Sequence, residues 1–272
     1  MPNTTDRWLA SYDEQLRSDA EMRYAIQVDR VGPLMLGTFR GGRGFVSYAP
    51  FSATGDGMLG DLVDAAVDHF AANPEITEFE WKTRGHDNLP GLQKLLTERG
   101  FVPEDPESVM VGESEALAVE VPLPDGVTLQ QVTDRPGLEL MCTMQAIVFA
   151  DPPESIAPRV EEHLREFAED TTGMEAWVAV SGGQVVSAGR INPVPGTDFA
   201  GIWGGSTLPQ WRGRGIYRAL TAARARAALR AGKTLINSDS TDYSRPILER
   251  YGFANVTTTT PYVWRRAVTR SH

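Results

Sequence analysis

Residues 209–220 read PQWRGRGIYRAL and stand between two segments of different character. The ten residues before them, FAGIWGGSTL, are apolar and spaced by glycine, which is typical of a buried strand. The residues after them, TAARARAALRAG, are strong helix formers that end at Gly232. A joint between a strand and a helix therefore contains two glycines and two arginines.

A glycine-rich turn before a helix can direct several backbone N–H groups at one point, where the helix N-terminus adds about half a positive charge. Gly213 and Gly215 place no side chain between those donors and a ligand. Arg212, Arg214 and Arg218 add long cationic side chains. The turn predicts a site for phosphate or pyrophosphate, and tight packing is the alternative reading of such a glycine pair.

Two nucleotide-binding patterns are excluded around this turn. The dinucleotide fingerprint needs a third glycine and a place at the first strand of its domain, and neither is found. The sequence contains no GxxxxGK(S/T) loop, so it does not predict a nucleotide hydrolase of the P-loop class.

The bulk composition indicates an ordinary globular protein of two domains. The chain has 272 residues, of which 41% are hydrophobic. The single Cys142 excludes an internal disulfide and a multi-cysteine metal site. The polar N-terminus lacks the apolar run of a signal peptide, and no segment reaches the roughly 20 apolar residues of a transmembrane helix. We therefore expect a cytoplasmic protein that does not bind membranes.

The net charge of -10 is unevenly distributed. Residues 201–272 hold 12 Lys and Arg against three Asp and Glu, whereas the first 200 residues hold 14 against 33. A basic end on an acidic chain indicates a local anionic ligand rather than nucleic acid, which usually needs a basic module. Arginine on exposed helix faces is the simpler alternative.

Hydrophobic periodicity predicts two successions of strands and helices. In the first half we expect a helix at 5–23, strands at 24–39 and 44–51, a helix at 57–74, a strand at 76–83, a helix at 89–100 and a strand at 101–113. A Pro-rich acidic segment at 114–126 joins the two halves. The second half begins with a strand at 127–133, helices at 136–149 and 155–169, and strands at 176–183, 184–194 and 199–208. We then expect a helix to 230, a strand at 233–240, a helix at 243–252 and one or two strands at 253–266.

The two halves contain similar endings. LLTERGFVPE at 95–104 and ILERYGFANV at 247–256 each predict a helix that ends in Gly-Phe before a strand. Two copies of one architecture is the preferred interpretation, with chance agreement as the alternative. We place the domains at 1–120 and 121–272.

The segment STLPQWRGRGIY resembles the acetyl-CoA signature of the GNAT superfamily of N-acetyltransferases. That signature is a strand ending Val-x-Pro, then Arg or Gln, two residues of any kind, Gly, one further residue, and Gly or Ala. Arg212 and Gly215 occupy the Arg/Gln and Gly places, whereas Thr207 replaces Val and Tyr217 replaces Gly or Ala. The resemblance covers about residues 125–268.

The resemblance implies an α+β fold with two GNAT-like domains, each a mixed central sheet flanked by helices. It also implies a cosubstrate, acetyl-CoA, whose pantetheine arm pairs with the backbone of Gly205, Ser206 and Thr207. The N–H groups of the turn and first helical residues would hold the pyrophosphate, and the implied residues run from Arg212 through Gly213, Arg214, Gly215, Ile216 and Tyr217 to Arg218.

The matching place in the first half is a poor anion site. It offers Gly55 and Gly57, but also Asp56 and Asp61 and no arginine. Negative side chains would repel a pyrophosphate. The first half is expected to be a degenerate GNAT-like domain without cofactor, and an unrelated α+β domain is the alternative.

The resemblance leaves the groups that move protons open. Many GNAT proteins use a Tyr four residues before the Gly-Phe of the penultimate helix, and Leu248 stands there. Asp239 is the best-placed carboxylate for a base, Ser244 a candidate hydrogen-bond donor, and Tyr251 a candidate acid beside Tyr243 and Tyr262. Each has a packing or capping role as its alternative. Asp198 and Glu175, at strand starts, are weaker carboxylate candidates.

The remaining candidates are weak, and the sequence contains no metal-ligand spacing. The four histidines are scattered, His163 is expected on a solvated helix face, and Cys142, Phe149, Trp177 and Trp203 are expected to fill apolar positions or line a pocket. We therefore predict an acetyltransferase for a small-molecule primary amine, without metal, as monomer or homodimer. A protein or peptide N-acetyltransferase and a non-catalytic acyl-CoA sensor are the alternatives.

Overall fold

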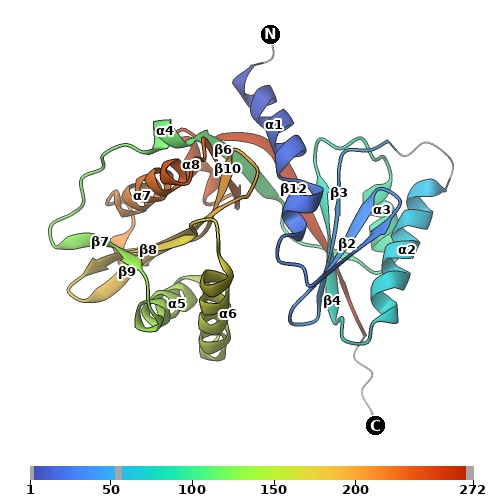
Figure 1. Ribbon diagram of the computed structural model, residues 1–272, viewed down its shortest axis with the longest axis horizontal. Coiled ribbons are helices and arrows are strands. Elements are labelled where there is room, and N and C mark those ends of the chain that lie inside the picture. Colours follow the sequence, from blue (N-terminus) through green and yellow to red (C-terminus); the bar gives the residue numbers. More distant parts are fainter. Residues whose placement is uncertain (1–2, 53–56, 268–272) are drawn as a thin grey trace. The chain divides into compact units, whose positions relative to one another are not determined.

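The computed structural model describes residues 3–52 and 57–267 of the chain (Figure 1). Two compact units form, and each contains residues from distant parts of the sequence. Unit 1 comprises Met1–Met110, Asp239–Arg245 and Asn255–His272, and unit 2 comprises Val111–Ser238 and Pro246–Ala254. The end of the chain thus belongs to unit 1, and a boundary between residues 120 and 121 stays a prediction.

Unit 1 is built on a mixed sheet in the order β1-β2-β3-β4-β12, with β5 paired to β12. Only β3 and β4 run parallel among its pairs with a described register. The strands are β1 (Gln27–Val31), β2 (Leu34–Phe39), β3 (Arg43–Tyr48), β4 (Glu78–Arg84), β5 (Val102–Pro103) and β12 (Ala254–Arg265). The helices are α1 (Thr4–Gln15), the 3-10 helix η1 (Ser18–Met22), α2 (Met58–Ala72) and α3 (Leu92–Glu98).

The core of unit 1 lies between the sheet and α2 and α3, which cover one side of the strands, while α1 lies on the other side (Figure 1). Alternation along β4 explains this arrangement, because Phe79 and Trp81 enter that core and Glu80 and Lys82 point to the opposite face. The predicted turn residues Gly55 and Asp56 lie outside the described residues.

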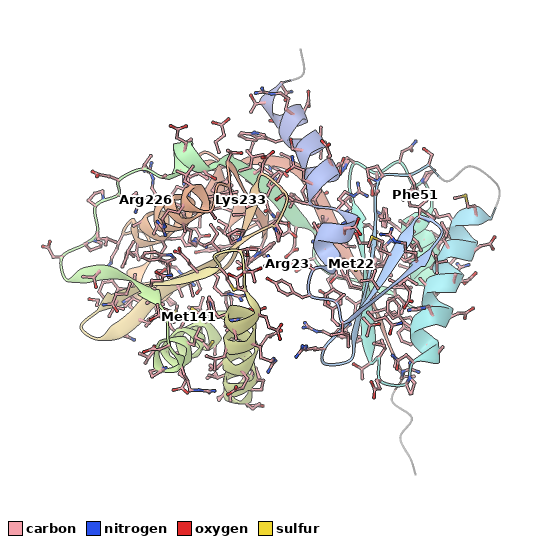
Figure 2. All side chains as sticks on the ribbon, in the orientation of Figure 1. Met22, Arg23, Phe51, Met141, Arg226 and Lys233 are labelled. Carbon is pink, nitrogen blue, oxygen red and sulfur yellow. The ribbon has the colours of Figure 1, made fainter. Side chains whose placement is uncertain are left out.

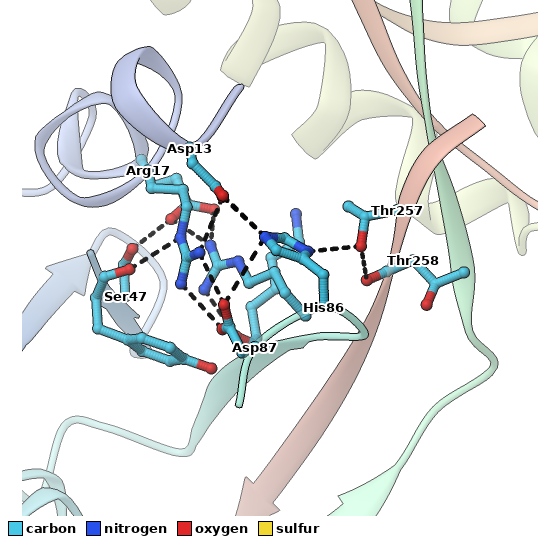
Figure 3. Close-up of polar contacts among 11 residues, drawn as sticks. Asp13, Arg17, Ser47, His86, Asp87, Thr257 and Thr258 are labelled. Atoms are coloured by element: carbon cyan, nitrogen blue, oxygen red, sulfur yellow. Dashed lines mark hydrogen bonds and ion pairs between the residues drawn. The ribbon is translucent and has the colours of Figure 1, made fainter. Parts of the chain in front are cut away.

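The helix predicted at 5–23 is shorter than expected. It ends at Gln15, and Arg17 adopts extended backbone before η1. The buried Arg17 side chain donates to the Tyr48 carbonyl and to both carboxylate oxygens of Asp87, at 2.9–3.1 Å. Figure 3 shows this cluster with Asp13, which also contacts Arg17 and His86. These buried contacts outweigh the local helix propensity.

Unit 2 contains strands in the order β6-β11-β10-β9-β8-β7. They are β6 (Glu107–Glu113), β7 (Val127–Val132), β8 (Glu175–Ser181), β9 (Gln184–Pro193), β10 (Phe199–Thr207) and β11 (Leu235–Ser240), and β6 and β11 each have part of their length in unit 1. The helices are α4 (Ser114–Leu117), α5 (Arg135–Phe149), η2 (Pro153–Ser155), α6 (Ile156–Glu169), η3 (Pro209–Trp211), α7 (Ile216–Arg230) and α8 (Arg245–Glu249).

Helices cover both faces of the unit 2 sheet, with α5 and α6 on one side and α7 on the other (Figure 1). Met141 and Cys142 of α5 are fully buried in the core, and burial raises the pKa of the Cys142 thiol. On the outer side of α7, Arg226 donates to the Val119 carbonyl at 3.1 Å and ties down the segment after α4 (Figure 2). The predicted class, mixed sheets flanked by helices, is confirmed.

Three local predictions were wrong. The strand expected at 101–113 divides into β5 and β6, because Pro103 and Pro106 lack the N–H groups that a ladder needs. His163 is buried rather than solvated, and its Nδ1 lies 3.0 Å from both Glu166 and Arg190. The last helix is only Arg245–Glu249.

Candidate active site

Strand β10 leaves one edge open along its second half. Its parallel pairing with β11 covers Phe199–Gly201 against Leu235–Asn237, although β10 continues to Thr207. On its other side β10 pairs with β9 as far as Thr207. The edge beyond Gly201 that would face β11 is therefore outside that ladder, and backbone groups on such an edge can pair with an extended ligand.

A bulge interrupts β10 within this open stretch. The register shifts between Trp203 and Ser206, and Gly204 has a φ of 62°, which favours glycine. Gln145 of α5 donates to the Gly204 carbonyl at 2.8 Å. The Tyr217 ring occupies the space beside Gly205, where a Cβ atom would lie 2.8 Å from its hydroxyl oxygen. Gly205 thus lets an aromatic ring of α7 approach the strand.

The end of β10 is fixed by side-chain hydrogen bonds. Ser187 of β9 donates to the Ser206 carbonyl at 2.6 Å, and its hydroxyl lies 2.7 Å from that of Thr207. Arg212 Nε donates to the Thr207 carbonyl at 3.0 Å, across the 3-10 turn of η3. The first arginine of the turn therefore holds the strand end and the turn together.

The turn leads directly into an uncapped helix. Gly213 and Gly215 have φ values of 73° and 79°, where a side chain would be strained. Gly215 is the N-cap residue of α7, and no side chain accepts from the first N–H groups of the helix. These donors, on Ile216, Tyr217 and Arg218, have no intrahelical partner. The first turn contains no acidic residue, so it presents unmatched positive potential.

Aromatic rings support the two outer arginines of the turn. The Arg214 guanidinium carbon lies 5.0 Å from the centre of the Trp211 ring, and that of Arg218 lies 5.6 Å from the Tyr251 ring. Arg214 and Arg218 are both exposed to solvent. Their stacking restricts two cationic side chains beside the helix N-terminus without neutralising their charge.

Sequence reasoning missed Arg224, a fully buried arginine in the middle of α7. It donates to the Leu220 carbonyl and to Thr221, and among the described residues its Nη1 has no hydrogen-bond partner. Burial lowers the pKa of Arg224, against the opposing electrostatic effect of Tyr217, whose ring centre lies 5.7 Å away. Gly189 of β9 makes room for it, because a Cβ there would lie 2.6 Å from Nη1.

Of the three catalytic candidates, Tyr251 lies in unit 2 beside the turn. Its ring centre is 6.1 Å from that of Tyr217, and burial together with Tyr217 raises the pKa of the Tyr251 phenol. Leu248, in the place of the family's tyrosine, is buried in the core. Two phenols, those of Tyr217 and Tyr251, therefore lie near the start of α7, at other positions of the sequence than the family's tyrosine.

The other two catalytic candidates, Asp239 and Ser244, belong to unit 1. The Asp239 carboxylate forms an ion pair with Lys82 at 2.7 Å. Burial lowers the pKa of Lys82, but attraction to Asp239, Tyr12 and Glu21 outweighs it and leaves that pKa raised. The Ser244 hydroxyl donates to the Thr241 carbonyl at 3.2 Å.

The two further phenols also belong to unit 1. Tyr262 is buried in the core of that unit, whereas Tyr243 is 65% exposed. Among the side chains that the structure describes, no group of three His, Cys, Asp or Glu is placed to hold a metal ion. Within the same residues, no helix is long and apolar enough to cross a membrane.

Residues 143–253, which include the open edge, the turn and α7, match the model of the acetyltransferase (GNAT) family. This segment is therefore a GNAT domain, and acetyl-CoA is the usual cosubstrate of that family. A comparison with curated protein sequences gives no match.

Solved structures with the same fold extend over nearly the whole chain. A GCN5-related N-acetyltransferase from Kribbella flavida has a TM-score of 0.72 at 17% identity, with 98% of each chain covered. A functionally unknown conserved protein from Staphylococcus epidermidis has 0.70 at 13% identity, over 92% of this chain and 98% of that one. A tandem GNAT protein from the clavulanic acid biosynthesis pathway has 0.62 at 15% identity, over 98% and 96%. The two units thus have the fold of a tandem GNAT protein.

Proposed function

We propose that the chain transfers the acetyl group of acetyl-CoA directly to the primary amine of a small molecule. The observation that supports this most is the uncapped, arginine-flanked start of α7 after the open half of β10, inside the segment that matches the GNAT family. In this proposal unit 2 supplies the acetyl-CoA site.

The open edge of β10 fits the pantetheine arm of acetyl-CoA. Pantetheine contains two amide groups, which can exchange hydrogen bonds with a strand edge as an added strand does. The stretch Gly205–Thr207 would supply these groups, and the contacts of Ser187 and Arg212 hold it in place before the ligand arrives. Such preorganisation reduces the entropy that binding costs.

The start of α7 fits the pyrophosphate. The two glycines at positive φ place no side chain over the turn, and the helix dipole favours an anion at the N–H groups from Gly213 to Arg218. Arg214 and Arg218 add charge-assisted contacts. The side chain of Tyr217, an unusual residue at its place in the motif, packs beside Gly205.

The reaction we propose forms one bond and breaks one. The neutral amine nitrogen attacks the thioester carbonyl carbon, the C–S bond breaks, and the amine gives up a proton while the sulfur leaves as thiolate or thiol. A lysine-like amine has a pKa near 10.4, so less than about 0.1% of it is neutral at pH 7 and an acceptor for its proton is needed. Asp239, Ser244 and Tyr251 stay the candidates for moving or holding these protons.

The decisive experiment measures free thiol released from acetyl-CoA by the full chain across a library of small primary amines. We expect at least one amine to be turned over, and Gly215→Glu to abolish turnover. Gly232→Glu is the matched control, because Gly232 follows the other end of α7 at a φ of 72° and a Cβ atom added there would meet nothing within 4 Å.

Two results would contradict the proposal. Binding of coenzyme A without turnover of any amine would favour a non-catalytic acyl-CoA sensor. Acetylation of basic peptides in strong preference to small amines would favour a protein or peptide acetyltransferase.

A further inference from the structure

Unit 1 contains a cavity of about 430 Å³, which is within the size range of small-molecule sites. It lies on the face of the sheet opposite the α2–α3 core, and every residue that lines it belongs to unit 1. Register places Glu80 of β4 directly between Phe45 of β3 and Val263 of β12 at the cavity floor. The Glu80 side chain therefore lines the cavity with an apolar residue beside it on each neighbouring strand.

Most charged groups around this floor already have partners. Lys82 pairs with Asp239 at 2.7 Å. Glu21 accepts from Arg84 at 2.6 and 2.7 Å and from the Ser47 hydroxyl.

The charges at the rim are also engaged. Arg265 contacts Glu78 at 3.2 Å and Glu104 at 3.3 Å. Arg43 is exposed and lies opposite Glu78 in the β3–β4 register. Glu80 differs from all of these, because within the described part of the chain its carboxylate forms no hydrogen bond or ion pair.

The electrostatic environment of Glu80 is short of positive charge. Burial raises the pKa of Glu80 to about 7. The nearby carboxylates of Glu21, Glu104 and Glu107 contribute to this increase, and the Lys82 ammonium opposes it. A carboxylate in such surroundings gains more from an added cation than a solvated one does.

Aromatic rings form the apolar part of the cavity wall. Phe39 and Phe45 are half-buried and pack edge to face with ring centres 6.4 Å apart. Aromatic rings beside a carboxylate are a recurring arrangement for organic cations, because the rings accept both the apolar body and the positive head. A phosphate or carboxylate ligand would instead add a second negative charge beside Glu80.

We propose that this cavity of unit 1 binds a small organic ammonium ion, with its charge at Glu80 and its apolar part against Phe39 and Phe45. Unit 1 is then a ligand-binding domain. The inference concerns unit 1 alone and does not rest on the acetyltransferase proposal.

The test is calorimetric titration of the full chain, without acetyl-CoA, with tetramethylammonium, cyclohexylammonium and 2-phenylethylammonium chloride. We expect at least one of them to bind, and the neutral 2-phenylethanol to bind at least tenfold more weakly than its ammonium counterpart. Glu80→Gln should weaken ammonium binding at least tenfold. Glu14→Gln, at an exposed position of α1, is the matched control and should leave it unchanged.

A pH series gives an independent signature. Affinity should rise between pH 6 and pH 8 as Glu80 ionises, with proton release on binding, and Glu80→Gln should remove this dependence. Gly215→Glu should keep ammonium binding, so failure of the acetyltransferase proposal would not affect this one. No binding of any ammonium ion at millimolar concentration, or equal affinity in Glu80→Gln, would overturn the inference.

Discussion

The two units begin their main helices in the same way but surround them with different charges. Gly57 starts α2 at a φ of 93° and Gly215 starts α7 at 79°, and neither helix has a side-chain cap. In each unit the helix joins two parallel strands, β3 to β4 and β10 to β11. Yet α2 has Asp61 in its first turn, whereas α7 has no acid there. Both helices thus start at a glycine in the left-handed region, and the charge of their first turns distinguishes them.

The largest expected effect comes from matched substitutions at these two glycines. Gly215→Glu should reduce coenzyme A affinity at least a hundredfold, because a carboxylate and a strained backbone replace an N–H-lined anion site. Gly57→Glu introduces the same charge at a similar φ and should leave affinity unchanged. Calorimetry checks both, with circular dichroism as the folding control. Equal losses in the two variants would remove the distinction between the units.

The two units also differ in how their buried arginines, Arg84 and Arg224, are paired. Arg84 in unit 1 pairs with Glu21, and this attraction outweighs burial and raises the pKa of Arg84. Burial lowers the pKa of Arg224 in unit 2, for which the described part of the chain provides no carboxylate partner. Removing one member of a buried pair typically costs about 3–5 kcal/mol, so Glu21→Gln should destabilise the protein strongly. Arg224→Met should be neutral or stabilising, because it removes a buried charge. Denaturant unfolding of both variants measures this contrast.

A double-mutant cycle between Gly189 and Arg224 tests how their contact affects stability. Gly189→Ala forces the guanidinium to move, since the new Cβ would lie 2.6 Å from it, and we expect a loss of about 1–3 kcal/mol. In the Arg224→Met background the same substitution should cost less. If the two substitutions changed the free energy of unfolding additively, the contact with Arg224 would not be the reason why residue 189 must be glycine.

The turn before α7 and the repeated Gly-Phe ending could be predicted from the sequence. The turn was predictable because glycine and arginine spacing is local information, and the repeated Gly-Phe ending was predictable for the same reason. In both copies the phenylalanine N–H bonds a buried leucine carbonyl, Phe101 to Leu96 and Phe253 to Leu248, each at 3.1 Å. Leu248 is therefore the counterpart of a core residue in unit 1.

The features that the sequence did not predict depend on contacts between segments that are distant in the chain. Arg224 and Arg226 lie two residues apart on α7, yet one is fully buried and the other exposed, and an alanine-rich helix gives no clear apolar face to distinguish them. The ion pair of Asp239 with Lys82 joins residues 157 positions apart. No local pattern signals such a pair.

The missing family tyrosine leads to a smaller predicted effect. Coenzyme A is a good leaving group with a thiol pKa near 8.5, and general acid catalysis contributes about 100- to 10,000-fold where it operates. We expect Tyr243→Phe, Tyr251→Phe and Tyr262→Phe each to lower turnover less than about tenfold. Steady-state kinetics measures this. A thousandfold loss in one variant with intact cofactor affinity would identify that phenol as the acid.

The smallest expected effect is a difference in how two glutamates, Glu80 and Glu166, make stability depend on pH. Burial raises the pKa of Glu80 to about 7, so the folded state holds its proton more tightly and stability falls as pH rises from about 4.5 to 7. Burial also opposes ionisation of Glu166, but His163 and Arg190 outweigh it and lower that pKa, so its contribution is lost as pH falls below about 4.5. Glu80→Gln should therefore stabilise the protein above pH 7 and Glu166→Gln should destabilise it. Thermal unfolding from pH 4 to 8 would show the opposite signs, and equal signs would be inconsistent with these environments.

The central claim is that acetyl-CoA binds at the start of α7 and not at the start of α2. Calorimetric titration of the full chain with acetyl-CoA tests it most directly through the number of sites. We predict one site per chain, lost in Gly215→Glu and kept in Gly57→Glu. Two equivalent sites per chain, or one site that survives Gly215→Glu, would contradict the account.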